Sequence, residues 1–115
     1  MDKFAMLSDD KSTIIYTDDC DAAWNSPNRF LKKEVVGDYL ISTVFIPTPL
    51  NSFYYDDVNT HIHFKCYVFP HSEEGTNFCE VWGKRAATYT DIMKYHEEAK
   101  QLILDGKIID SDDNN

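Results

Sequence analysis

The sequence predicts an α+β domain in which a two-layer arrangement packs an antiparallel sheet, a meander of three to five strands, against a C-terminal amphipathic helix. Three observations predict this class. Short runs of β-branched and aromatic residues occupy the centre of the chain, apolar and polar residues alternate over 60–69, and an apolar stripe at helical spacing follows Thr88. The 115 residues fit one domain, which we expect over 1–110, with 111–115 as an acidic flexible tail.

A hairpin is the clearest feature in the centre of the chain. Two β-branched runs at 33–36 and 39–46 flank the dipeptide Gly37-Asp38, which favours a tight turn. Pro47 ends the second run, because proline has no amide proton to donate to a neighbouring strand. We therefore expect two antiparallel strands that lie side by side.

Shorter elements are predicted on both sides of this hairpin. The run at 13–16 predicts a strand, and 21–24 predicts a helical turn with an aspartate near its N-terminus, where the helix dipole favours negative charge. Farther along, 70–75 predicts a turn and 77–85 predicts a strand. In that strand we expect Cys79 on the apolar face.

Residues 60–69 form the most regular predicted strand, because their apolar and polar side chains alternate. The even-numbered positions are apolar: Ile62, Phe64, Cys66 and Val68. If a helix covers that face, the opposite face stays partly open. The open face would then display His61, His63, Lys65, Tyr67 and Phe69.

The last predicted element is a helix that begins after Thr88. Thr88 is a favourable N-cap, and Asp91 three residues later completes a pair like a capping box. Gly106 is a suitable residue to end the helix. The stripe between these limits consists of Ile92, Met93, His96, Ala99, Leu102 and Ile103.

Aromatic and charged residues on the open sheet face and in the loop over 51–59 predict a binding surface. Acidic residues at its rim would favour a partner protein with a basic surface. The candidate binding residues are His61, His63, Lys65, Tyr67, Trp82, Tyr54, Tyr55, Asp56 and Asp57. The alternative interpretation is that about half of the aromatic residues close the core from the second side of the sheet.

The charge balance limits the classes of partner. The chain has 20 Asp and Glu against 11 Lys and Arg, a formal net charge of −9. A general nucleic-acid binder needs a positive surface that displaces counterions, and attachment to anionic lipid needs basic residues. We therefore expect no direct nucleic-acid binding and no membrane attachment.

His61 and His63 lie two residues apart, a spacing that suits a metal site or a phosphodiester-cleaving pair. No third ligand follows at a typical spacing. Cys66 and Cys79 are expected to be small buried thiols, and burial raises a thiol pKa, which disfavours a Cys–His catalytic pair. We therefore expect no metal, no cofactor and no catalytic residue.

Three separated segments of the chain are similar to motifs of a known protein family. They are Ile-Ser-Thr-Val-Phe at 41–45, Phe-Lys-Cys-Tyr-Val-Phe at 64–69, and Arg85 followed by Thr-Tyr-Thr-Asp at 88–91 and by His96. In order and spacing the chain resembles a family of small, uncharacterised bacteriophage proteins with motifs of the types S-T-V-[WF], F-E-T-M-[VI]-F and R-Y-x-T-x-x-E-A-x-x-G-H. It departs from these motifs at Lys65-Cys66, where the family has Glu-Thr. The resemblance implies a phage origin and action in the host cytoplasm, and it implies no known reaction.

The expected function is that of a phage accessory protein that binds and inhibits a host protein, for example a defence or nucleic-acid-handling factor, without catalysis. Two alternatives stay open. One is a small protein that sequesters a ligand such as a nucleotide, and the other is a small metal-dependent hydrolase that uses His61 and His63. Whether the protein forms a homo-oligomer also stays open.

Overall fold

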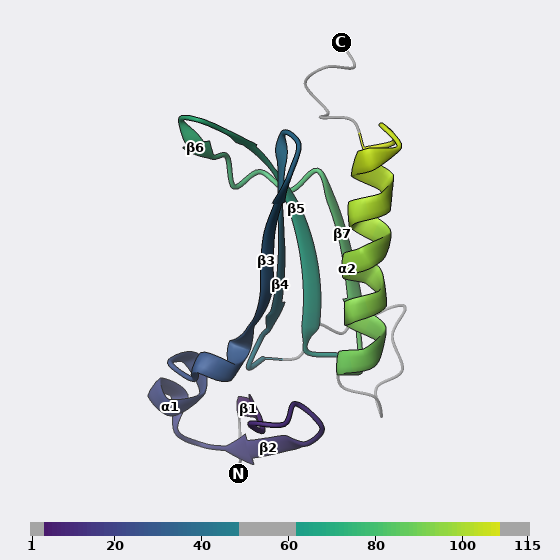
Figure 1. Cartoon of the computed structure of the whole chain (residues 1–115). Coiled ribbons are helices and arrows are strands. Elements are labelled where there is room, and N and C mark those ends of the chain that lie inside the picture. Colours follow the sequence, from purple (N-terminus) through teal and green to yellow (C-terminus); the bar gives the residue numbers. More distant parts are fainter. Residues whose placement is uncertain (1–3, 49–61, 109–115) are drawn as a thin grey trace, which may run out of the picture.

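The computed structural model describes residues 4–48 and 62–108 (Figure 1). In chain order the elements are β1 (Phe4–Leu7), β2 (Ile14–Thr17), α1 (Cys20–Trp24), a 3-10 turn (Pro27–Arg29), β3 (Phe30–Val36), β4 (Tyr39–Phe45), β5 (Phe64–Ser72), β6 (Gly75–Thr76), β7 (Trp82–Ala86) and α2 (Tyr89–Leu104). They form an antiparallel sheet packed against a C-terminal helix, so the predicted α+β class is confirmed.

Five antiparallel strands make up the main sheet. β4 pairs with β3 on one side and with β5 on the other, and β5 pairs with β7 along its first half and with β6 at its far end. Gly37 turns the β3–β4 hairpin at a φ of +59°, a conformation that glycine adopts without a steric penalty. The predicted hairpin is therefore confirmed.

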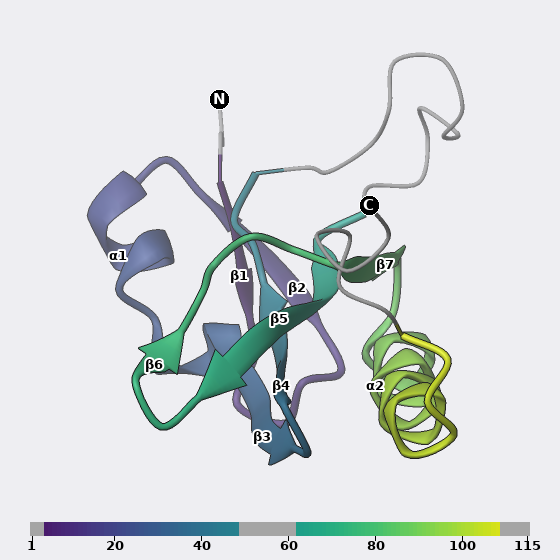
Figure 2. The same ribbon diagram turned by 90° about the horizontal axis from the view of Figure 1, so that it is seen from above.

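α2 covers one face of this sheet (Figure 2). At its first turn the Thr88 hydroxyl oxygen accepts a hydrogen bond from the Asp91 amide, as predicted. At its end Gly106 has a φ of +70°, and the amides of Gly106 and of the next residue donate to the carbonyls of Ile103 and Leu102. These two bonds form a Schellman motif, which confirms the predicted end of the helix.

The main core lies between α2 and the sheet. On β5 it takes the even-numbered side chains, so the predicted alternation is confirmed from Phe64 onward. The most deeply buried apolar members are Ile41, Phe45, Phe64, Cys66, Val68, Ile92 and Ala99. Among the described residues, no helix is long and apolar enough to cross a membrane.

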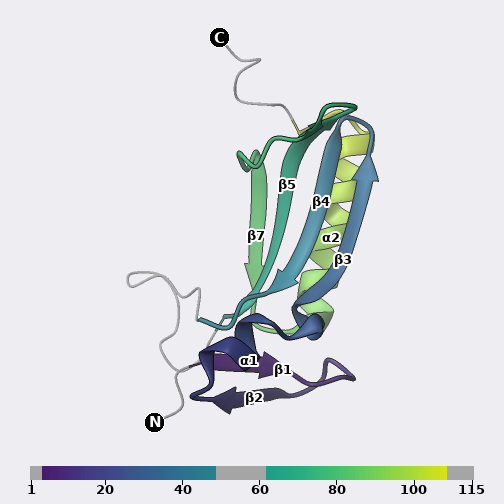
Figure 3. The same ribbon diagram turned by 90° about the vertical axis from the view of Figure 1, so that its left-hand side faces the viewer.

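β1, β2 and α1 form a small N-terminal unit at one end of the sheet (Figure 3). The sequence does not predict β1, because a run of only four residues shows little periodicity. The Ala5 amide donates to the Pro47 carbonyl at 2.9 Å. The Arg29 guanidinium donates to the carbonyls of Phe45 and Trp24, so it ties the end of α1 to the end of β4.

Two predicted boundaries after β5 are wrong. The turn expected over 70–75 begins later, because β5 continues to Ser72. The strand expected over 77–85 is shorter, and 77–81 is irregular. Cys79 is therefore exposed instead of buried, because it lies on no face of the sheet.

Candidate functional site

The strand register decides which side chains share the face of the sheet turned away from α2. Directly paired residues of antiparallel strands point to the same face. We call this face the open face; Figure 3 looks onto it, and no helix of the described residues lies in front of it. It carries Phe30, Lys33, Val35, Leu40, Ser42, Val44, Lys65, Tyr67, Phe69 and Arg85.

The predicted binding residues Lys65 and Tyr67 lie on this face and begin a row of contacting side chains. The Lys65 ammonium is 5.0 Å from the centre of the Tyr67 ring. The rings of Tyr67 and Phe69 stack with centres 5.3 Å apart, and Phe78 meets Phe69 edge-on at 5.2 Å. Burial raises the pKa of the Tyr67 phenol, so the hydroxyl is neutral at pH 7.

An ion pair lies beside this row. Lys65 Nζ is 3.1 Å from Glu80 Oε1, and both side chains are partly buried. A Cβ atom at Gly83 would overlap the Glu80 carboxylate, so the absence of a side chain at Gly83 lets the carboxylate lie against β7. Glu80 belongs to the irregular segment before β7, and sequence alternation does not indicate this contact.

Two predicted residues are not on the open face. His63 is only 1% exposed, stacks on Phe45 at 5.2 Å, and has Nδ1 2.7 Å from the Ile46 carbonyl oxygen. It precedes the first residue of β5, so the alternation of that strand does not apply to it. Trp82 pairs with Val68 and therefore lies on the face under α2, where it packs against the core.

The other five predicted site residues lie outside the residues that the structure describes. They are His61, Tyr54, Tyr55, Asp56 and Asp57. Within 4–48 and 62–108, no group of three or more His, Cys, Asp or Glu residues is placed to hold a metal ion.

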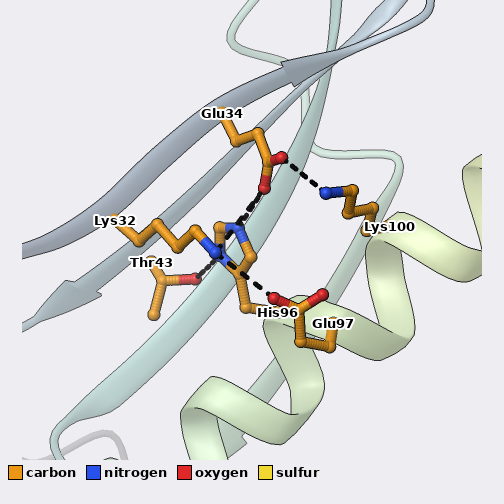
Figure 4. Close-up of polar contacts among 6 residues, drawn as sticks. All are labelled: Lys32, Glu34, Thr43, His96, Glu97 and Lys100. Atoms are coloured by element: carbon orange, nitrogen blue, oxygen red, sulfur yellow. Dashed lines mark hydrogen bonds and ion pairs between the residues drawn. The ribbon is translucent and has the colours of Figure 1, made fainter.

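A buried polar network joins α2 to β3 and β4 (Figure 4). His96 Nδ1 lies 2.7 Å from Thr43 Oγ1, and His96 Nε2 lies 3.1 Å from Glu34 Oε1. The second Glu34 oxygen is 2.9 Å from Lys100 Nζ. The helical spacing places His96 in the apolar stripe of the helix but does not indicate these partners, which lie 53 and 62 residues away along the chain.

Burial and hydrogen bonding determine the protonation state of His96 in this network. Burial lowers the pKa of His96 although the Glu34 carboxylate favours the charged imidazole, so His96 is neutral at pH 7. A carboxylate only accepts hydrogen bonds, hence Nε2 carries the proton and Nδ1 accepts from the Thr43 hydroxyl. Hydrogen bonds from Lys100 and His96 lower the pKa of Glu34, and Glu34 in turn raises the pKa of Lys100.

The hydroxyl, imidazole and carboxylate of this network are the groups of a hydrolytic triad, but the hydroxyl is not accessible to a substrate. Thr43 and His96 are fully buried, so a substrate cannot reach the hydroxyl. Cys66 is also fully buried, and burial raises the pKa of its thiol to about 11. A thiol with that pKa is a poor nucleophile at pH 7. The network therefore fastens the helix to the sheet.

The N-terminal unit carries a second surface feature. Its exposed apolar side chains are Ile15, Tyr16 and Trp24. Its exposed carboxylates are Asp9, Asp10, Asp18, Asp19 and Asp21. The sequence pattern did not indicate that this unit would expose apolar side chains as well as aspartates.

Two of these aspartates also have local structural roles. Asp19 accepts a hydrogen bond from the Ala22 amide and caps α1. Hydrogen bonds from Ser8 and Ser12 lower the pKa of Asp10 to about 2. The Asp10 carboxylate is therefore charged at neutral pH, and hydrogen bonds hold both carboxylates in place.

No family model, curated protein or solved structure matches the chain. The fold class therefore rests on the structure, and the resemblance to a bacteriophage family stays a prediction. The described residues present two surfaces suited to binding: the open face, with its aromatic row and cations, and the acidic N-terminal unit.

Proposed function

We propose that the protein is a non-enzymatic binding protein that docks its acidic N-terminal unit on a partner protein with a basic surface. From the sequence resemblance we infer that this partner is a host protein and that the chain is a phage accessory protein that inhibits it in the host cytoplasm. The observation that carries the proposal is that the N-terminal unit exposes Ile15, Tyr16 and Trp24 and also exposes several aspartates.

The composition of this unit supports docking on a protein. Large aromatic and apolar side chains supply most of the energy at protein interfaces, and charged residues around them steer the encounter and set the partner's charge. Ile15 and Tyr16 are successive residues of β2, so they expose apolar surface on both faces of the β1–β2 pair. Among the described residues β2 pairs only with β1, so its other edge offers backbone groups that a partner can bond.

The test compares charge reversal on two surfaces. In the first variant, Asp18→Lys is combined with Asp21→Lys; neither carboxylate takes part in a hydrogen bond or ion pair among the described residues. The matched control combines Glu73→Lys with Glu98→Lys, which changes the net charge equally at exposed positions elsewhere. Each immobilised protein is incubated with bacterial lysate, and the retained protein is identified and assayed for its own activity with and without this chain.

We expect the wild type and the control to retain one basic protein in stoichiometric amount. The Asp18→Lys, Asp21→Lys variant should not retain this protein, and added salt should release it from the wild type. Addition of the chain should inhibit the retained protein. The proposal fails if no stoichiometric partner appears at low or moderate salt, or if both variants retain the same protein equally.

A further inference from the structure

The open face differs in charge from the rest of the protein. The chain as a whole has 20 acidic and 11 basic residues. On the open face the charged side chains of β3, β5 and β7 are Lys33, Lys65 and Arg85, and Glu80 forms an ion pair with Lys65. Lys33 is exposed and forms no ion pair within the described residues. The face is therefore a locally cationic surface on an acidic protein.

Apolar side chains lie between and beside these cations. Phe30 is 67% exposed, Val35 is 55% exposed and Phe78 is 73% exposed. Leu40 on the same face is almost fully buried and pairs with Val35 and Phe69 near the hairpin end of the sheet. A groove of about 240 Å³, lined in part by Phe30 and Val44, offers space for a side chain from a partner.

The arrangement of the rings decides between two classes of anionic partner. Single-stranded nucleic acid binds cationic sheets by stacking bases on exposed ring faces. Tyr67 is partly buried, and its ring already contacts the Lys65 ammonium and the Phe69 ring. The second central ring, Phe69, already contacts Tyr67 and Phe78. Because the two central rings are engaged in these contacts, they leave less ring surface for stacked bases than free rings would, which favours a partner with apolar side chains.

We propose that the open face binds an acidic segment of a protein partner. The carboxylates of the segment lie against Lys33 and Arg85, and its apolar side chains contact Val35 and Phe78. This surface is separate from the acidic N-terminal unit and takes a partner of opposite charge. The variants that test the open face therefore leave the N-terminal unit unchanged, and the variants that test the N-terminal unit leave the open face unchanged, so the two proposals are tested separately.

The test uses a short fluorescein-labelled peptide of glutamates interspersed with leucines, titrated with the full chain by fluorescence anisotropy. The first variant combines Lys33→Glu with Arg85→Glu. Its matched control combines Lys94→Glu with Lys107→Glu, two exposed cations outside the open face. A second variant, Phe78→Ser, removes an exposed ring and so tests the face even where the first variant fails to fold.

We expect saturable, salt-sensitive binding that the Lys33→Glu, Arg85→Glu variant weakens about tenfold or more, since each reversal replaces an attraction with a repulsion. Phe78→Ser should weaken binding several-fold, and the Lys94→Glu, Lys107→Glu control should leave it unchanged. In nuclear magnetic resonance spectra of the isotope-labelled chain, the signals that shift on addition of the peptide should belong to residues of β3, β5 and β7.

Four results would overturn the proposal. The acidic peptide does not bind, or a matched lysine-leucine peptide binds equally well. An oligothymidylate binds to the same face more tightly than the peptide, which would assign nucleic acid instead. The wild type self-associates in sedimentation and Lys33→Glu with Arg85→Glu abolishes it, which would assign a second copy of the chain.

Discussion

The substitution Thr43→Val tests whether the buried network fastens α2 to the sheet. It replaces one hydroxyl by a methyl group and leaves the shape of the side chain almost unchanged. Thr43 is fully buried, and its hydroxyl donates to His96 Nδ1 at 2.7 Å. The substitution therefore removes one hydrogen bond with little change in packing.

The expected cost follows from what remains in the folded protein. His96 Nδ1 loses its donor, and because His96 is fully buried no bulk water replaces it. The ring cannot adapt by moving its proton to Nδ1, since Nε2 needs the proton for the bond to Glu34. A buried polar atom left without a partner costs about 1–3 kcal/mol. We expect the free energy of unfolding to fall by about 2 kcal/mol, a large part of the roughly 5–15 kcal/mol of a typical domain.

The assay is urea unfolding at pH 7, followed by far-ultraviolet circular dichroism and by the fluorescence of Trp24 and Trp82. A double-mutant cycle with His96→Leu supplies the control, because removing both partners leaves no orphaned atom between them. The double variant should lose less stability than the sum of the two single variants. The difference measures the coupling between Thr43 and His96.

The reasoning is refuted if Thr43→Val unfolds within about 0.5 kcal/mol of the wild type, the usual range for substitutions that touch no such feature. The reasoning is refuted equally if the losses of unfolding free energy caused by Thr43→Val and His96→Leu are simply additive in the double variant. Either result would mean that the network contributes little and that apolar packing alone holds α2.

Three further predictions concern pH and two glycines. Burial lowers the folded pKa of His96 below its unfolded value of about 6.5, so stability should decline as the pH falls from about 7 through 6.5, because the unfolded state gains the proton before the folded state does; urea midpoints measured across this range should show a smaller slope for His96→Gln. Gly106→Ala places a Cβ at a φ of +70° and should cost about 1 kcal/mol in urea unfolding, whereas an unchanged midpoint would contradict the assigned helix end. Gly83→Ala should displace Glu80 and release Lys65 at little cost in stability, seen as faster side-chain motion of Lys65 by nuclear magnetic resonance, and an immobile Lys65 would argue against the close approach.

Local patterns predicted the elements that depend on neighbouring residues. The Gly37 turn with its flanking runs indicated β3 and β4, and Thr88 and Gly106 indicated the limits of α2. Alternation predicted the buried side of β5. These succeed because turn, cap and periodicity signals act over a few residues.

Sequence pattern failed where alternation had to be carried across an irregular segment. The residues at 77–81 have the composition of a strand but do not form one, so alternation counted through them wrongly predicted a buried Cys79 and placed Trp82 on the wrong face. His63 failed for a similar reason, because β5 begins just after it. The candidate site was therefore predicted in part: Lys65 and Tyr67 lie on the open face, and Trp82 and His63 do not.

By itself the sequence determined the fold class, the acidic character of the chain, the β3–β4 hairpin and the apolar faces of β5 and α2. Only the tertiary structure decided that His96 would meet Thr43 and Glu34, and that cations and aromatic side chains would share one face of the sheet. The physical reason is that periodicity assigns a side chain to a side of its own element, whereas strand register and helix packing choose its neighbours. Those choices depend on contacts between residues far apart in the chain, as in the separations of 53 and 62 residues around His96.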